Sequence, residues 1–320
     1  MKVLYLPLGD QQSVVKAFQN TGVELRVFDF LGIFQNYLNQ GMSNGSSDQR
    51  MSNQFVDVVR EFKPDLIHMQ LQMTGLMTSE ALIEAKNIVP NVVITNWTGD
   101  IRQHTSESFI KTSKYVDFSL MSNTGQIELY KNAGCKNPTY WQIGFDDKNH
   151  FPKFINSFKY DVSFIANNYN DFPDSNLRSS AANKIKNEFG DRAGIFGSGF
   201  PGGPVSFGCI NDIYNDSLCV LSISNFNDVS HYFSDRLPVC LATGRPVICY
   251  RFPGLDSYLQ DGRDVVVVNS IDEIIDNVKY FKENVDKANI IGKNGYMKAI
   301  SEHSFTSRIL ELYSIAGVCI

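Results

Sequence analysis

The sequence lacks the signals of a membrane-spanning, secreted or disulfide-linked protein. In its 320 residues no apolar run approaches the roughly 18 residues that a membrane-spanning helix needs. A secretory signal peptide is not expected, because Gly9 and Asp10 stop the short apolar run at the start. The six cysteines form no CxxC pair, and several lie in apolar segments where a reduced cysteine acts as a small hydrophobe. These absences favour a cytoplasmic protein.

Several chemical signatures are missing as well. No GxGxxG follows the first apolar segment and no GxxxxGK[ST] occurs, so dinucleotide binding and Walker-type hydrolysis lose their main support. The five histidines have no HxH or HExxH spacing, and there is no Asp-x-Asp; the adjacent Asp146 and Asp147 would point to opposite sides of an extended chain. We therefore predict no metal site.

The charge is low and mixed. The 29 basic and 34 acidic residues give a net charge of −5, and Lys148, Lys153 and Lys159 are only sparsely spaced. The surface as a whole is therefore not an electrostatic trap for nucleic acid or anionic lipid. With 43% hydrophobic residues the chain can build a packed core, and at roughly 150 residues per domain its length favours two domains.

What is present is an alternation of strand-like and helix-like segments. Six apolar segments of the first half are predicted strands: Val3–Leu8, Glu24–Phe28, Asp65–Met69, Asn91–Asn96, Phe118–Met121 and Thr139–Ile143. Five more lie in the second half: Asp161–Ala166, Ala193–Phe196, Leu218–Ile223, Pro246–Tyr250 and Val265–Val268. Such strands between amphipathic helices are typical of a parallel sheet covered on both faces. We predict an α/β fold with two Rossmann-like domains facing a cleft.

Some of the connecting segments can be placed too. Ser52–Phe62 has its apolar residues on one helical face and ends before a proline. In the helix Ser270–Phe281, Ser270 and Glu273 form a capping box ahead of an apolar stripe. Gln35–Gln54 is rich in Asn, Gln, Ser and Gly, which predicts a mobile loop, either a lid over a binding site or a plain disordered linker.

A charged, aromatic connector near residues 147–158 separates the two halves. We therefore predict one domain over residues 1–147 and a second over residues 148–304. The remaining residues, 305–320, are predicted to form a last helix.

In open α/β sheets, ligands bind at the carboxyl ends of the strands. Two loops of the second half directly follow predicted strands and would lie at these ends. Gly197, Ser198 and Gly199 follow one strand, and small residues there let a ligand approach the backbone, although a simple tight turn has the same signature. Ser224 and Asn225 follow the next strand.

The strongest local signal lies just downstream. Because proline is accepted in the first turn of a helix, Pro238 places a helix start at Ser234 or Asp235. Gly244 would follow as its C-cap. Arg236 then projects from the first turn beside N–H groups without helical partners, an anion site suited to a diphosphate. The alternative is a surface ion pair of Arg236 with Asp235 or a nearby carboxylate.

The first half offers candidates for acid–base chemistry. The segment Trp97–Asp100 directly follows the predicted strand Asn91–Asn96. An acidic residue at the carboxyl end of a strand can reach a cleft, so Asp100 is a candidate general base. His104, four residues later, is a second candidate. Both residues have an alternative role as helix caps or solvated side chains.

Several motifs of the second half occur in an order known from one family. They are Asp161-Val162-Ser163-Phe164-Ile165 with Arg178, Ile195-Phe196-Gly197-Ser198-Gly199-Phe200, Leu221-Ser222-Ile223-Ser224-Asn225, Ser234-Asp235-Arg236 with Ala242-Thr243-Gly244-Arg245-Pro246-Val247-Ile248, and His303-Ser304-Phe305 with Arg308. Over residues 160–310 their order and spacing resemble the GT-B glycosyltransferases of the group 1 superfamily, and within them the spore maturation (CgeB-like) family. The first half matches only in pattern.

The resemblance implies a metal-independent glycosyltransferase that moves a sugar from a nucleotide-diphosphate donor, a UDP-sugar, to an acceptor hydroxyl without a further cofactor. The first domain would hold the acceptor, and the last helix would pack back on that domain. Arg236 would stabilise the departing diphosphate. The second domain would hold the donor through Arg178, Gly197, Ser198, Gly199, Ser224, Asn225, His231, Ser234 and Arg236.

The sequence departs from the superfamily at two positions. Where the resemblance places glutamates, this chain has His231 and Val239, and valine cannot accept a hydrogen bond from the nucleotide ribose. A non-catalytic module that binds nucleotide sugars or glycans is therefore an alternative, and so is a nucleotide-sugar isomerase. The acceptor stays open among a glycan, a lipid-linked sugar, a small molecule, a protein side chain and a hydroxymethylated DNA base. The sequence does not indicate which oligomeric state the protein adopts.

Overall fold

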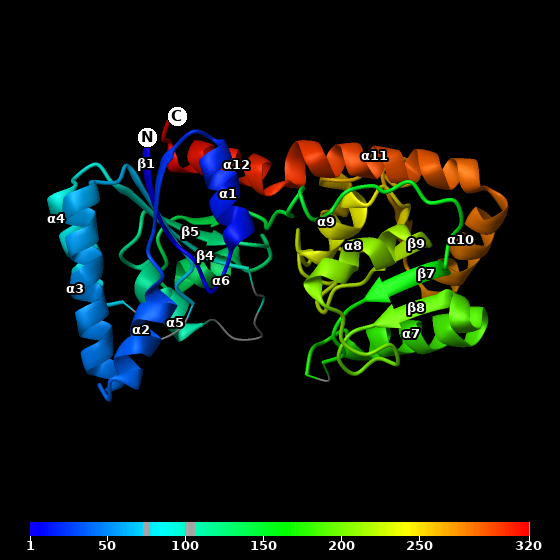
Figure 1. Ribbon diagram of the computed structural model, residues 1–320, viewed down its shortest axis with the longest axis horizontal. Coiled ribbons are helices and arrows are strands. Elements are labelled where there is room, and N and C mark those ends of the chain that lie inside the picture. Colours follow the sequence, from blue (N-terminus) through cyan, green and yellow to red (C-terminus); the bar gives the residue numbers. More distant parts are fainter. Residues whose placement is uncertain (73–76, 100, 102–105, 170, 320) are drawn as a thin grey trace. The chain divides into compact units, whose positions relative to one another are not determined.

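The computed structural model describes residues 1–72, 77–99, 101, 106–169 and 171–319. Two compact units make up the chain (Figure 1). Unit 1 comprises Met1–Gln142 together with Arg308–Ile320, and unit 2 comprises Ile143–Ser307. Each unit contains its own parallel β-sheet, so the prediction of an α/β fold with two parallel-sheet domains is confirmed.

Unit 1 is built on a six-stranded parallel sheet with the order β2-β1-β3-β4-β5-β6. Its strands are β1 (Lys2–Leu6), β2 (Glu24–Val27), β3 (Leu66–Met69), β4 (Val93–Thr98), β5 (Phe118–Met121) and β6 (Pro138–Tyr140). Its helices are α1 (Gln12–Asn20), α2 (Phe30–Asn39), α3 (Asn44–Phe62), α4 (Ser79–Ile88), α5 (Glu107–Ser113) and α6 (Ile127–Asn132). All four residues of β3 are buried, as expected for a strand that helices cover on both faces.

The last helix, α12 (Phe305–Ala316), belongs to unit 1 from Arg308 onwards. The indole nitrogen of Trp141 donates to the carbonyl of Arg308 at 2.8 Å. Tyr313 packs on Phe18 with a ring separation of 6.3 Å, and its hydroxyl lies 2.9 Å from that of Thr21. Residues from both ends of the chain thus share one core.

The prediction of a mobile loop at Gln35–Gln54 is wrong, because α2 and α3 occupy this segment. The side chain of Ser43 caps α3 by accepting from the N–H of Ser46 at 3.3 Å. Further along α3, Ser47 and Ser52 are buried, and these small side chains let α3 pack closely between α2 and α4 (Figure 1). Polar composition therefore concealed a helix whose buried face is partly made of serine.

Unit 2 is built on a five-stranded parallel sheet with the order β11-β10-β9-β7-β8. Its strands are β7 (Tyr160–Ile165), β8 (Ala193–Phe196), β9 (Ser217–Ser222), β10 (Val247–Tyr250) and β11 (Val266–Val268). Its helices are α7 (Ser175–Phe189), α8 (Phe207–Asn215), α9 (Arg236–Ala242), α10 (Ile271–Glu283) and α11 (Val285–His303), with short 3₁₀ turns η1 (Gly190–Arg192) and η2 (Leu255–Ser257). Two hydrophobic clusters pack in this unit, one around Phe164 and one around Leu241.

Strand order determines where a ligand can bind in unit 2. The chain runs from β7 outward to β8 and then returns to place β9 on the other side of β7. In open α/β sheets, ligands bind at the carboxyl ends of the strands where the order reverses in this way. That point lies between β7 and β9.

Candidate functional site

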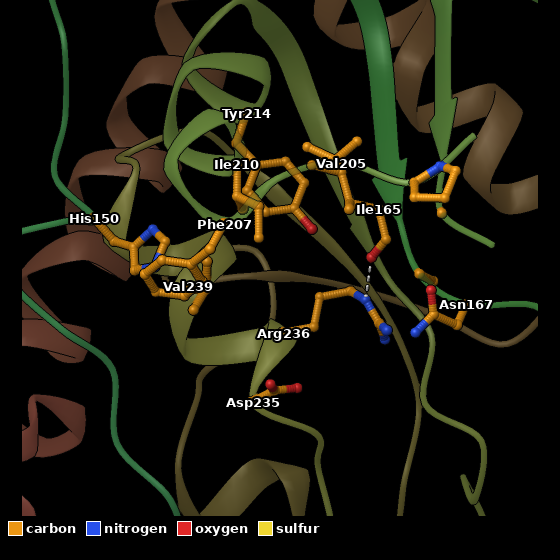
Figure 2. Close-up of a pocket in the computed structure, with 13 residues that line it drawn as sticks. His150, Ile165, Asn167, Val205, Phe207, Ile210, Tyr214, Asp235, Arg236 and Val239 are labelled. Atoms are coloured by element: carbon orange, nitrogen blue, oxygen red, sulfur yellow. Dashed lines mark hydrogen bonds between the residues drawn. The ribbon is translucent and has the colours of Figure 1, made fainter. Parts of the chain in front are cut away.

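A cavity of about 310 Å³ lies at this reversal point of unit 2 (Figure 2). Its walls come from the loops after β7 and β8, from α8 and α9, and from the segment that precedes β7. The residues that line it are His150, Ile165, Ala166, Asn167, Gly197, Pro204, Val205, Phe207, Ile210, Tyr214, Asp235, Arg236 and Val239. A volume of this size is at the lower end of those that hold small molecules, roughly 300–1,000 Å³.

Gly197 shapes the floor of the cavity after β8. It has a φ of 124°, and a Cβ atom at this position would lie only 1.7 Å from the carbonyl oxygen of Ala166. Its N–H donates to the carbonyl of Gly203 at 2.7 Å, which closes the loop. Ser198 is exposed and its N–H donates to the side chain of Asn167 at 3.1 Å. The loop is therefore a tight turn that at the same time lines the cavity.

Arg236, the first residue of α9, is held across the reversal point. Its Nε donates to the carbonyl of Ile165 at 2.7 Å, and its Nη1 donates to the carbonyl of Ile223 at 3.0 Å. These carbonyls lie at the ends of β7 and β9, so the sheet itself orients the guanidinium toward the cavity (Figure 2). The sequence predicted the helix start and Arg236 as its first-turn cation; the ion pair with Asp235 is not seen between these described residues.

A second arginine lies by the same aromatic ring as the first. Arg178, in α7, is only 1% exposed, and its guanidinium carbon lies 5.7 Å from the ring centre of Phe164, while that of Arg236 lies 5.4 Å from the same ring. Burial, and next the positive charge of Arg236, lower the pKa of Arg178 to about 9. Its Nε has no hydrogen-bond partner among the described residues.

The two guanidinium groups create an electropositive site. Arg178 stays protonated near neutral pH despite its lowered pKa. Neither Arg178 nor Arg236 forms an ion pair within the described part of unit 2. Arginine pairs bind phosphate oxygens strongly, and an anion at the cavity would offset their mutual repulsion. The geometry is therefore suited to a phosphate or diphosphate.

Of the nine predicted donor-binding residues, Gly197 and Arg236 line the cavity, and the other seven, Arg178 included, do not. Ser224 is buried and accepts from the N–H of Ser234 at 3.3 Å, so both organise the turn that precedes α9. Asn225 has a buried side-chain oxygen without a partner among the described residues. His231 has a φ of 59°, and its ring packs at right angles to that of Tyr258 at 5.6 Å. Gly199 and Ser198 follow Gly197 but do not line the cavity.

Other lining residues carry little or no signal in the sequence. Asn167 is the second residue after β7, and the rule that ligands bind at strand ends could have singled it out. His150 and Phe207 come from the connector and from the start of α8, and no motif marks them. Val239, noted only as a departure from the superfamily, does line the cavity.

Unit 1 has a polar cluster at the corresponding reversal of its own strand order, between β1 and β3. Gln11 donates to the side chain of Gln70 at 2.8 Å, and Gln70 donates to the hydroxyl of Tyr5 at 3.1 Å. Every member of this cluster is uncharged. Asp100 and His104, the predicted bases, lie outside the described residues.

Comparison with known proteins gives one family match. Residues 178–314 match the family model described as glycosyl transferase-like. This stretch begins at Arg178 and runs through the cavity loops into α12. This part of the chain is therefore similar to a glycosyl transferase-like domain. No curated protein matches the sequence.

Solved structures extend the likeness to both units. A crystal structure of Anabaena Alr3699/HepE in complex with UDP-glucose is 13% identical with a TM-score of 0.60, and the match covers 99% of each chain. A glycosyltransferase from Rickettsia africae ESF-5 is 13% identical with a TM-score of 0.62, over 98% of this chain and 97% of that one. The DNA modifying enzyme beta-glucosyltransferase is 12% identical with a TM-score of 0.61, over 99% and 100%.

These comparisons identify the fold as the GT-B fold of glycosyltransferases, as the sequence predicted. The prediction of a glycosyltransferase is confirmed at the level of this fold and of the matched domain. In the described part of the chain no helix has the length and apolar character to cross a bilayer. No cluster of three or more His, Cys, Asp or Glu suited to a metal ion occurs among the same residues, and metal independence stays a prediction.

Proposed function

We propose that the protein transfers a sugar from a UDP-sugar to an acceptor hydroxyl, with the donor diphosphate held in the cavity of unit 2. The observation that carries this proposal is the pair of arginines at the strand reversal, Arg236 in the cavity wall and Arg178 buried by the same aromatic ring. The complexes of Anabaena HepE with UDP-glucose and of the DNA modifying beta-glucosyltransferase with uridine diphosphoglucose support a uridine nucleotide as the carrier.

In the proposed reaction the acceptor oxygen bonds to the anomeric carbon while the bond from that carbon to the diphosphate breaks. Negative charge then develops on the leaving diphosphate, and Arg236 can stabilise it without a metal ion. If the reaction inverts the anomeric centre, a base removes the proton of the acceptor hydroxyl. Asp100 and His104 are our candidates for that base.

For the acceptor we favour an uncharged, hydroxyl-bearing molecule such as a glycan or a small metabolite. The support is the amide and hydroxyl cluster of Tyr5, Gln11 and Gln70 at the strand reversal of unit 1. Such groups can both donate to and accept from sugar hydroxyls.

A hydroxymethylated DNA base is the second candidate acceptor, because one similar structure is a DNA modifying glucosyltransferase. The net charge of −5 counts against it. Retention on duplex DNA that disappears as salt is added would favour this candidate, since phosphate contacts release counterions. Failure to bind DNA in dilute salt would eliminate it.

The donor proposal is tested by calorimetric titration with UDP, GDP and ADP, followed by hydrolysis assays of the corresponding glucose conjugates. We expect UDP to bind and UDP-glucose to be turned over slowly by water. Absence of binding by every nucleotide would refute the proposal. Tight UDP binding without turnover of any sugar conjugate would instead favour a non-catalytic nucleotide-sugar module, consistent with Val239 and His231 at the glutamate positions.

We also propose the finer placement in the spore maturation (CgeB-like) family, supported by Ser234-Asp235-Arg236 and by His303-Ser304-Phe305 with Arg308. A cytoplasmic location is proposed in turn. It is supported by six free cysteines, four of them buried among apolar side chains as reduced thiols commonly are.

A further inference from the structure

His150 is a buried histidine in the wall of the cavity. Its side chain is 1% exposed and its ring packs at right angles to that of Phe207, with 5.2 Å between ring centres. Figure 2 shows the imidazole beside Phe207 and Val239 in the cavity wall. Neither ring nitrogen, Nδ1 or Nε2, has a hydrogen-bond partner among the described residues.

Unpaired buried nitrogens are unusual in a folded protein, because they have lost hydrogen bonds to water without replacing them. Burial lowers the pKa of His150, although the carboxylates of Asp146 and Asp235 act in the opposite direction. A neutral imidazole has one N–H donor and one acceptor nitrogen. It is therefore matched to hydroxyl groups, which donate and accept, rather than to a phosphate, which only accepts.

The backbone fixes the position of this ring. The N–H of His150 donates to the carbonyl of Asp146 at 2.9 Å, which closes a turn. The next residue, Phe151, donates to the side chain of Asn211 at 3.1 Å and accepts from that of Asn215 at 3.0 Å. Because both asparagines belong to α8, the imidazole is held in place before any ligand arrives.

The surroundings of His150 indicate which part of a ligand it meets. Phe207 is 59% exposed, and together with Val239 and Ile210 it gives this part of the cavity an apolar wall. A flat nucleobase and the carbon face of its ribose suit such a wall, whereas phosphates suit Arg236. The hydroxyls that reach His150 are then those of the ribose.

We propose that His150 hydrogen-bonds a ribose hydroxyl of the nucleoside diphosphate whose phosphates lie at Arg236. This inference rests on the proposed function, because it needs a nucleotide in the cavity. It assigns His150 as a binding residue that distinguishes ribonucleotides from deoxyribonucleotides.

The test compares UDP with 2′-deoxy-UDP and 3′-deoxy-UDP by calorimetry. Wild-type protein is expected to bind at least one deoxy analogue about tenfold more weakly than UDP, the effect of losing one buried hydrogen bond. In His150→Phe the ratio should fall to near one, because the ring nitrogens are gone. Lys148→Ala is the matched control, since it lies in the same turn with a side chain that is 78% exposed, and it should keep the wild-type ratio.

A thermal unfolding measurement separates binding from a structural role. Without UDP, His150→Phe should melt at the wild-type temperature or above it, because two unpaired buried nitrogens are removed. Its stabilisation by added UDP should be smaller than that of the wild type. If His150→Phe does not fold, His150→Ala is titrated with the same three nucleotides, and a loss of discrimination has the same meaning.

The possible outcomes separate the role of His150 from the proposed function on which it rests. Equal discrimination against the deoxy analogues in wild type and His150→Phe would overturn the role of His150, and so would a wild type that binds all three nucleotides alike. In either case UDP binding itself would leave the proposed function standing. A wild-type protein that binds no UDP would refute both.

Discussion

Arg236 and Arg178 show how two residues of the same type can have different tasks in one site. Arg236 faces the cavity and is oriented by carbonyls of two strand ends, whereas Arg178 is 1% exposed and contributes charge from a buried position. An anionic ligand that contacts Arg236 is attracted by the positive charges of both arginines. Substitutions at the first should therefore remove contacts, while those at the second should change the local potential and the packing on Phe164.

Arg236→Ala is expected to weaken UDP binding by about tenfold to a hundredfold, because a hydrogen bond to a charged group is worth about 1.5–3 kcal/mol. Calorimetric titration with UDP measures the effect. Arg251→Ala serves as the control, since Arg251 belongs to the same unit and pairs with Asp256 at the surface. Unchanged UDP affinity in Arg236→Ala with a native circular dichroism spectrum would contradict the assignment.

Asp161, at the start of β7, is the charged residue on which stability should depend most visibly. Its side chain is 2% exposed and accepts from Arg192 Nε at 2.7 Å and from Lys282 Nζ at 2.7 Å. Burial alone would raise the pKa of Asp161, but the two cations outweigh it and hold the pKa below its usual range. The ionised form is thus favoured by folding.

Asp161→Asn should lower the free energy of unfolding at pH 7 by about 1–3 kcal/mol, since the cations lose a charged acceptor. The stabilising effect of this carboxylate is complete above its unfolded-state pKa, near 3.9, and is lost as pH falls through the lower folded-state pKa. The difference between wild type and variant should therefore shrink below about pH 4. Urea unfolding at pH 7 and pH 3 measures it. Asp256→Asn, at an exposed surface pair, should differ little from wild type at either pH.

Among the individual residues of the site, the sequence could predict those whose type is fixed by the local backbone conformation. Gly197 follows the end of β8 and Arg236 begins α9, and their positions came from glycine and proline patterns that have a local physical cause. His150 and Phe207 could not be predicted, because their meeting depends on α8 lying beside a connector that is some 57 residues away in the chain, and no local pattern encodes that contact. The roles of Asp100 and His104 remain predictions.

Among the elements, α11 illustrates packing that small residues make possible. A Cβ atom at Gly292 would lie 2.2 Å from the carbonyl oxygen of Gly244, and one at Gly295 would lie 2.5 Å from that of Asp264. Spacing of three residues places both glycines on one face of the helix. That face contacts α9 and the segment before β11, so α11 helps to hold the helix that carries Arg236.

Gly292→Ala should destabilise unit 2 by about 1–3 kcal/mol, because the added methyl group forces apart backbone that cannot yield as a side chain would. Thermal unfolding followed by circular dichroism measures the loss. Gly208→Ala is the matched control, since a Cβ atom at this position in α8 meets nothing within 4 Å and alanine favours helix. A Gly292→Ala variant as stable as wild type would show that α11 can shift away without cost.

Element by element, the strands were the easiest to predict and the polar helices the hardest. Phe118–Met121 and Ala193–Phe196 coincide with β5 and β8, because continuous apolar runs mark a strand buried on both faces. The capping residue of α10 was also found: Ser270 accepts from the N–H of Glu273 at 3.2 Å. The return bond from Glu273 goes instead to the N–H of Asn269, at 2.8 Å. α3 was partly missed, because its N-terminal half buries serines rather than aliphatic side chains.

At the scale of the whole molecule, the proposed reaction divides its tasks between two units. All residues that line the nucleotide cavity belong to unit 2, whereas the strand β4 that precedes Asp100 belongs to unit 1. Binding of the donor and activation of the acceptor should therefore be separable by mutation. A module that only binds nucleotide sugars would show no such division, because it needs no base.

Asp100→Asn and His104→Gln test this division directly. If Asp100 is the base, Asp100→Asn should lower the rate of sugar transfer by about a hundredfold or more, the usual contribution of general base catalysis, while UDP affinity stays at the wild-type value. His104→Gln should then retain most of the activity; the opposite result would move the role to His104. Transfer rates with a competent acceptor and UDP titrations of the same preparations provide both readouts. Full activity in both variants would point to a mechanism without a protein base, as expected for a transferase that retains the anomeric configuration.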